Sequence, residues 1–119
     1  MKISRPLHVA ILVSDLEASK RFYGGILGLE QKPRPNFDTP GVWYQLGGLE
    51  LHLILTTRQL LPGGEKPATD YHLALAVEDH EVTKRELKDA GVPYKESSVP
   101  IKQIFIRDPD GNVIELQSL

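Results

Sequence analysis

The chain contains the same pattern twice, about 64 residues apart, and this repeat limits the folds that it can adopt. The segment HVAILVSD begins at His8 and HLALAVED begins at His72; both have Ala at the third place and Asp at the eighth. Farther along each copy, a turn glycine precedes a ligand-type residue by four positions, which gives His52 in one copy and Glu115 in the other. A duplicated unit is therefore predicted, within 119 residues that suit one small domain.

Each copy predicts the same order of secondary structure. The β-rich runs 8–13 and 72–77 predict strands, and helices of roughly three turns should follow them. Segment 14–17 resembles a capping box, and Asp79 is the expected N-cap of the second helix. A glycine cap, a short strand and a hairpin should then follow in each copy. The expected caps and hairpin turns are at Gly28, Gly91, Gly47–Gly48 and Asp108–Gly111.

These elements predict an α+β fold made of tandem βαβββ modules. The first module spans about residues 1–57 and the second about residues 70–119, joined by a linker of about 56–70 that is rich in Pro, Gly and polar residues. We expect the modules to form a curved mixed sheet that carries its helices on the outer face.

Strand alternation places four ligand-type side chains on the same face of this predicted sheet. His8, His52, His72 and Glu115 all fall on the face away from the helices. Three imidazoles and a carboxylate buried together are unfavourable unless they are paired or coordinate something. The sequence therefore predicts a site for a divalent ion, with Zn, Ni, Co, Mn or Fe as the candidates. The remaining histidine, His80, begins a helix and is interpreted as a solvated neighbour of its cap.

Composition excludes several other classes of site and partner. The chain has no cysteine, so a metal must use imidazole, carboxylate or water. The net charge of -2, with scattered Lys and Arg, argues against nucleic acid or an anionic membrane surface as the partner. Residues 1–6 lack the apolar core of a signal peptide, and no apolar run is long enough to span a bilayer. We therefore expect a cytoplasmic protein that acts on a small molecule.

Four segments of the chain resemble the vicinal oxygen chelate superfamily, which includes glyoxalase I, fosfomycin-resistance thiol transferases, extradiol dioxygenases and bleomycin-resistance proteins. HVAILV, SKRFY and LGL, at residues 8–13, 19–23 and 27–29, resemble the N-terminal glyoxalase I signature. DPDGNVIE, at residues 108–115, is similar to a C-terminal hairpin shared by many members. The resemblance covers nearly the whole chain and is specific for the superfamily, whereas it does not select one activity.

The resemblance implies a ligand set. His8, His72 and Glu115 match metal ligands shared by several active branches, and His52 matches a fourth position that is not a ligand in the thiol transferases. The fosfomycin branch is matched less well, because Phe105 stands where a tyrosine is expected and Ala10 where a threonine is. Small two-module members commonly form dimers, and the resemblance implies a homodimer in which module one of each chain pairs with module two of the other.

The first functional hypothesis is isomerase or lyase chemistry of the glyoxalase type. A metal would bind two adjacent substrate oxygens and stabilise an enediolate, while Glu115 moves the proton. Glu50 is the alternative base if it reaches inward, although we interpret it as a solvated strand residue.

Two other hypotheses stay open at this point. An Fe(II) dioxygenase would use two histidines and one carboxylate, but a fourth ligand at His52 would block a position that oxygen and substrate need. A non-catalytic drug-binding and resistance protein would line its pocket with Phe37, Trp43 and Phe105. The loop 33–40, where specificity should lie, identifies no substrate.

Overall fold

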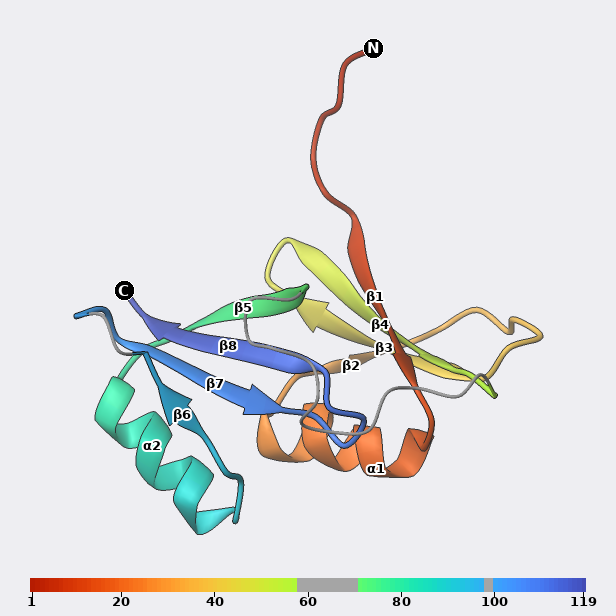
Figure 1. The fold of residues 1–119 in the computed structure, drawn as a ribbon. Coiled ribbons are helices and arrows are strands. Elements are labelled where there is room, and N and C mark those ends of the chain that lie inside the picture. Colours follow the sequence, from red (N-terminus) through yellow and green to blue (C-terminus); the bar gives the residue numbers. More distant parts are fainter. Residues whose placement is uncertain (58–70, 98–99) are drawn as a thin grey trace. The chain divides into compact units, whose positions relative to one another are not determined.

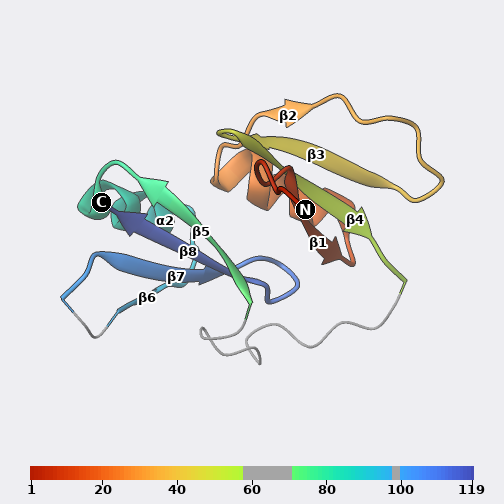
Figure 2. The same ribbon diagram turned by 90° about the horizontal axis from the view of Figure 1, so that it is seen from above.

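The computed structural model describes residues 1–57, 71–97 and 100–119. The chain divides into two compact units, with the division at residues 59 and 60. Each unit consists of a strand, a helical segment and three further strands, and Figures 1 and 2 show the helix of each unit on one face of that unit's own sheet. The α+β class built of two βαβββ modules is thus confirmed. The predicted linker at about 56–70 falls largely outside the described residues.

Unit 1 holds a mixed four-stranded sheet with the order β1-β4-β3-β2. Strand β1 runs parallel to β4, and the other two pairings are antiparallel. The bounds are β1 (His8–Val13), α1 (Leu16–Lys20), the π-helix η1 (Arg21–Ile26), β2 (Gln31–Lys32), β3 (Gly41–Leu46) and β4 (Leu49–Leu55).

Unit 2 repeats this topology with the order β5-β8-β7-β6. Strand β5 runs parallel to β8, and the other pairings are again antiparallel. The bounds are β5 (His72–Val77), α2 (His80–Asp89), β6 (Lys95–Glu96), β7 (Gln103–Arg107) and β8 (Val113–Ser118). The predicted first strands 8–13 and 72–77 are both confirmed.

The first helix begins one residue later than its predicted capping box. The N-cap is Asp15, whose carboxylate accepts a hydrogen bond of 3.0 Å from the backbone N–H of Ala18. The capping box expected at residues 14–17 is therefore wrong, because Asp15 is the residue whose backbone is still extended just before the first helical turn. Asp79 caps α2 in the same way, as predicted.

Both helical segments end at the predicted glycines. Gly28 and Gly91 have φ angles of 69° and 71°, the left-handed conformation that favours glycine at a helix C-terminus. In unit 1 the last turns form the π-helix η1, where Gly24 leaves room for a core residue. A Cβ at Gly24 would lie 3.2 Å from the hydroxyl of Tyr44, a buried side chain of β3.

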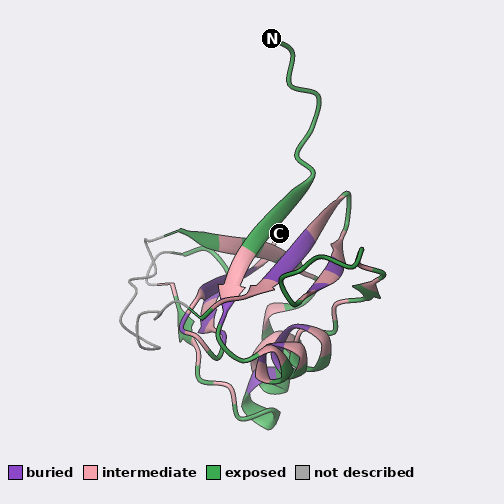
Figure 3. Ribbon diagram, turned by 90° about the vertical axis from the view of Figure 1, so that its right-hand side faces the viewer, coloured by how far each residue is buried: buried purple, intermediate pink, exposed green. Residues whose placement is uncertain are grey.

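The core of each unit lies between its helix and the helix-facing side of its sheet. Leu51 and Leu53 of β4 are fully buried, and Ile114 and Leu116 of β8 are at most 4% exposed. Figure 3 shows buried segments within the sheets, whereas most of β1 is exposed or intermediate. The first strand is at the edge of its sheet in both units. Over the described residues, no helix has the length and apolar character needed to cross a membrane.

Candidate functional site

Strand register places one predicted ligand pair in each unit. In unit 1 the parallel pairing of β1 and β4 sets Ala10 opposite His52, and His8 lies two residues earlier on the same face. In unit 2 the pairing of β5 and β8 sets Ala74 opposite Glu115. The predicted repeat equivalence of His52 and Glu115 is therefore an equivalence of position in the two sheets.

In unit 2 the pair is joined by a hydrogen bond. His72 Nε2 lies 2.9 Å from Glu115 Oε2, and Gln103 Nε2 donates to Glu115 Oε1 at 2.6 Å. The Glu115 side chain is only 9% exposed. Phe105 lies edge-on to the His72 ring, with 6.1 Å between centroids. The carboxylate is thus buried with both oxygens engaged, which offsets the unfavourable transfer of its charge from water.

In unit 1 the equivalent positions form a stack of rings. His52 lies between Trp43, at 3.9 Å and 2° between planes, and His8, at 4.1 Å and 14°. His52 Nε2 contacts Glu50 Oε1 at 3.1 Å. Both faces of the imidazole are covered and one ring nitrogen is engaged, so the orientation of His52 is fixed by its neighbours.

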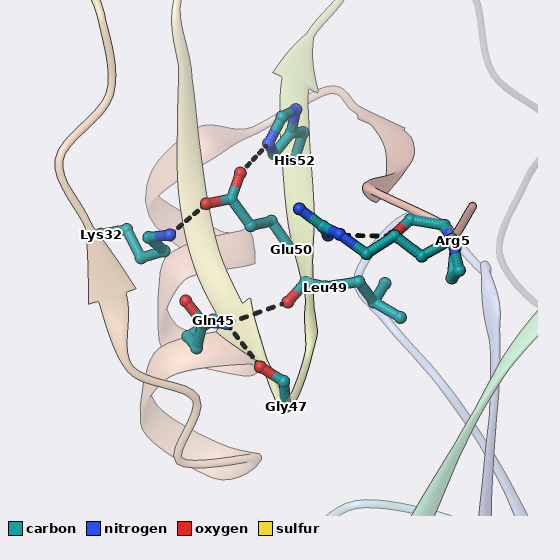
Figure 4. Close-up of polar contacts among 8 residues, drawn as sticks. Arg5, Lys32, Gln45, Gly47, Leu49, Glu50 and His52 are labelled. Atoms are coloured by element: carbon teal, nitrogen blue, oxygen red, sulfur yellow. Dashed lines mark hydrogen bonds and ion pairs between the residues drawn. The ribbon is translucent and has the colours of Figure 1, made fainter. Parts of the chain in front are cut away.

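Glu50 is not the solvated strand residue that the sequence suggested. Its side chain is 24% exposed and makes ion pairs with Lys32 and His52, as Figure 4 shows. The pKa of the Glu50 carboxyl is lowered, mainly by the hydrogen bond from Lys32 and next by the hydrogen bond with His52. Lys32 on β2 lies opposite Trp43 on β3, which lies opposite His52 on β4. This row across the sheet brings the ammonium group of Lys32 to the face that carries Glu50 and His52.

A cavity of about 780 Å³ lies over this face of unit 1. The predicted pocket residues Phe37 and Trp43 both line it, and their ring centroids are 6.0 Å apart. Phe105 belongs to unit 2, and its role in substrate binding stays a prediction. The polar and charged residues that line it include Arg5, His8, Lys32, Arg34, Glu50 and His52.

The donor set of the two pairs suits a divalent ion. Imidazole nitrogen and carboxylate oxygen are ligands that Zn, Ni, Co, Mn and Fe all accept. An imidazole nitrogen and a carboxylate oxygen 2.9 Å apart, as in His72 and Glu115, are close enough to share one proton or to approach one cation. Within residues 1–57, 71–97 and 100–119, no group of three or more His, Asp or Glu side chains has the arrangement of a metal site. The four-ligand site therefore stays a prediction.

His80 is not a solvated neighbour of the helix cap. Its side chain is 10% exposed, and Nε2 lies 2.9 Å from Glu96 Oε1. Lys84 Nζ approaches the same oxygen at 3.3 Å. The pKa of Glu96 is lowered, mainly by the hydrogen bond with His80 and next by the hydrogen bond with Lys84. His80 therefore joins α2 to β6, because its side chain points back to the sheet instead of outward.

Three residues of these two sites were not found from the sequence. Lys32 could have been found from cross-strand register, since it shares a row with Trp43 and His52. Gln103 could have been found from strand alternation, because it lies two residues before Phe105 on the same face. Arg34 comes from a loop without periodicity, and no sequence signal indicated it.

The sequence matches the family model of the glyoxalase/bleomycin resistance protein/dioxygenase superfamily over residues 5–116. Because the match spans most of the chain, this protein belongs to that superfamily, and the resemblance seen in the sequence is confirmed.

Three individual relatives share part of the sequence. The chain is 33% identical to the glutathione transferase FosA of Serratia marcescens, covering 92% of this chain and 77% of the relative. It is 31% identical to Glyoxylase I 4 of Arabidopsis thaliana, covering 92% and 67%. The lactoylglutathione lyase of Haemophilus influenzae is 26% identical, covering 92% and 88%.

Solved structures agree on the fold. A protein assigned to the glyoxalase family in Bacillus anthracis superposes with a TM-score of 0.83 at 25% identity, covering 99% of this chain and 97% of that one. A mutant of the fosfomycin resistance protein FosX of Listeria monocytogenes, complexed with Mn(II) and a dihydroxypropylphosphonic acid, superposes with a TM-score of 0.79 at 21% identity, covering 98% and 93%.

Proposed function

We propose that this protein is a metal-dependent enzyme of the glyoxalase type that carries out lyase or isomerase chemistry on a small molecule. The observation that carries the proposal is the equivalence of the two ligand pairs. His8 with His52, and His72 with Glu115, come from the same positions of two parallel strand pairs. Membership in a superfamily that contains lactoylglutathione lyase supports the reaction class.

The four side chains His8, His52, His72 and Glu115 are the proposed ligands of one divalent ion. When bound, such an ion polarises adjacent substrate oxygens and stabilises negative charge that develops on them. In unit 1, Glu50 engages Nε2 of His52 and so leaves Nδ1 as the ring nitrogen available to a ligand. A carboxylate on the second ring nitrogen is the usual partner of a metal-binding histidine.

Glu115 is the proposed proton carrier. Gln103 and His72 hold its two oxygens, which orients the carboxylate. Glu50 is a poorer base, because hydrogen bonds from Lys32 and His52 lower its pKa and so stabilise its ionised form. Glu50 therefore acts in this proposal as the partner of His52.

The reaction can be tested with the hemithioacetal of glutathione and methylglyoxal, an isomer of lactoylglutathione. Protein purified without chelators should contain a divalent ion and convert this adduct, and EDTA should abolish the rate until Ni, Co or Zn is returned. A strict requirement for Fe(II) and oxygen would instead assign a dioxygenase. Protein with no bound ion that gains none on incubation would exclude both enzymes and leave a sequestering protein.

A glutathione transferase reaction is the second candidate function. The identity of 33% to FosA of Serratia marcescens favours it. Phe105 and Ala10 stand where tyrosine and threonine are expected in that branch, which disfavours fosfomycin itself as the acceptor. Loss of free glutathione thiol in the presence of an epoxide, with no lactoylglutathione formed from the hemithioacetal, would support the transferase over the lyase.

We also propose that the enzyme is a homodimer in which unit 1 of each chain pairs with unit 2 of the other. Support comes from the distribution of ligands, since each unit supplies only two of the four. An ion shared by two chains links metal affinity to dimer stability. Sedimentation with and without chelator tests this link: the dimer dissociation constant should rise when the metal is removed, and an unchanged constant contradicts a shared site.

A further inference from the structure

The cavity of unit 1 carries more positive than negative charge. Three cationic side chains line it, those of Arg5, Lys32 and Arg34, and Glu50 is the single carboxylate among the described lining residues. Lys32 is ion-paired with Glu50, so these two charges offset each other. Figure 4 shows Arg5 on the opposite side of Glu50 from Lys32. Arg5 and Arg34 therefore leave the cavity lining with a net positive charge, which favours an anionic ligand.

The guanidinium of Arg34 is held in place by contacts that use only part of its N–H donors. Its Nη2 donates to the carbonyl oxygen of Thr39 at 2.6 Å, and its Cζ lies 4.9 Å from the centroid of the Phe37 ring. Its Nε is buried and has no hydrogen-bond partner among the described residues. Arg34 lines the cavity, and its guanidinium has more N–H donors than the one that Thr39 accepts, so the remaining Nη donors are the groups that bind an oxyanion there.

An aromatic wall stands beside this guanidinium. Trp43 and Phe37 line the same cavity, with their rings tilted by 43° to each other, and Ile54 extends the apolar lining. Pockets that combine an apolar wall with a few fixed polar groups bind ligands that have both characters. The cavity therefore suits a molecule with an anionic end and a flat apolar body.

We propose that this cavity is a substrate subsite that binds a carboxylate or phosphonate group through Arg34 and the adjoining apolar part of the molecule through Trp43 and Phe37. The proposal rests on the proposed function in that the bound molecule is the substrate of that reaction. The subsite itself uses only residues of unit 1 and needs no metal ion.

Trp43 is the single tryptophan of the chain, so its fluorescence reports on the cavity. The probes are phenylphosphonate, benzoate and neutral benzyl alcohol, which share an aromatic ring and differ in charge. At least one anion should quench the fluorescence saturably and bind ten times more tightly than the alcohol, and added salt should weaken it. The phosphonate and carboxylate arms show which oxyanion is preferred. Equal affinity for the alcohol, or no saturable binding of either anion, overturns the proposal.

Substitutions at Arg34 distinguish specific binding of the anion by this side chain from an effect of the protein's overall charge. Arg34→Gln should weaken binding of the preferred anion at least tenfold and leave the alcohol unchanged. Arg21→Gln, at an exposed position of η1 outside the cavity, is the matched control and should change neither. Where circular dichroism shows that Arg34→Gln does not fold, Arg34→Lys keeps the charge without the two-pronged geometry and should weaken the anion at least threefold. Equal effects of the Arg34 and Arg21 variants contradict the subsite.

Measurement in EDTA distinguishes this proposal from the metal-dependent function. Anion binding that persists in EDTA and depends on Arg34 supports the subsite, whether or not the protein shows lyase activity. Anion binding that disappears in EDTA and is insensitive to Arg34→Gln overturns the subsite and supports a bound metal as the anion's ligand.

Discussion

In unit 1 the row of side chains that crosses β4 and β3 places Trp43 against His52, whereas the equivalent row of unit 2 places Phe105 beside Glu115. The rings of unit 1 stack in parallel, and a cavity lies over them. In unit 2 the aromatic ring stands edge-on to His72, and the carboxylate is hydrogen-bonded. The two units thus share the same backbone register but carry different side chains on it: a ring stack under a cavity in unit 1 and a hydrogen-bonded carboxylate in unit 2.

A single pair of positions shows how the backbone enforces this difference. Gly41 pairs with Ile54 in unit 1, and Gln103 pairs with Gln117 at the same place in unit 2. A Cβ at Gly41 would lie 2.4 Å from the carbonyl oxygen of Leu53, so no side chain fits there. At the equivalent position of unit 2, the side chain of Gln103 is accommodated and donates a hydrogen bond to Glu115. At this position unit 2 therefore supplies a side chain, Gln103, that orients Glu115, and unit 1 has only a glycine.

The largest effect is expected at Glu115, where Gln replaces the carboxylate at nearly the same volume. Glu115→Gln removes both a proposed metal ligand and the proposed proton carrier, and kcat should fall at least about 100-fold. Steady-state rates with the hemithioacetal and metal analysis of the same samples measure it. Glu86→Gln, on the exposed face of α2, is the control. A rate within threefold of the wild type would remove Glu115 from the chemistry.

Gly41→Ala tests the steric difference between the units. The added methyl group meets backbone atoms that cannot move aside, and the free energy of unfolding should fall by about 1–3 kcal/mol. Urea denaturation measures this change. Gly48→Ala is the matched control, because a Cβ at Gly48 has no atom within 4 Å. Equal stability of the two variants would show that the sheet of unit 1 tolerates a side chain at Gly41.

Gln103→Ala tests the orienting partner in unit 2. Without this donor, Glu115 Oε1 loses its 2.6 Å hydrogen bond, and kcat should fall roughly tenfold. KM should change little, because Gln103 is proposed to act through Glu115 and not through the substrate. A rise in KM at constant kcat would instead place Gln103 in substrate binding.

The smallest effect is expected at the α2 cap. The backbone N–H of Val82 is the main cause that lowers the pKa of Asp79 below its ordinary value of 3.8. A depressed folded-state pKa adds stability above the unfolded-state value, and this contribution is lost as the pH falls below about 3.8. Asp79→Asn keeps an acceptor but does not titrate. The stability difference between wild type and Asp79→Asn should therefore shrink in that acid range, and a difference constant with pH contradicts the assignment.

The fold could be predicted from the sequence because its signals are local. Alternating apolar residues, capping aspartates and turn glycines each report on a few neighbours, and their repetition in two copies reinforces them. The ligand faces follow from the same period of two. Asp15 was missed as the first cap because Ser14 with Glu17 offers an equally good pattern, and the choice between them depends on the backbone angle at the cap.

The environment of the candidate site was harder to predict from the sequence, because it depends on partners that are distant along the chain. From the sequence alone, Glu50 and His80 are expected to be solvated. In the structure they are partly buried and are paired with Lys32 on β2 and Glu96 on β6, which reach them only after the sheets form. The ring stack on His52 also needs three strands at once.

Metal stoichiometry tests most directly whether the two unequal pairs act together. Calorimetric titration of the chelator-treated protein with Zn or Ni should give one ion per chain. His52→Ala removes a proposed ligand from unit 1, and His72→Ala removes a proposed ligand from unit 2; both should weaken the same binding event at least tenfold. Two independent ions per chain, or full affinity in either variant, would contradict a single site built from both units.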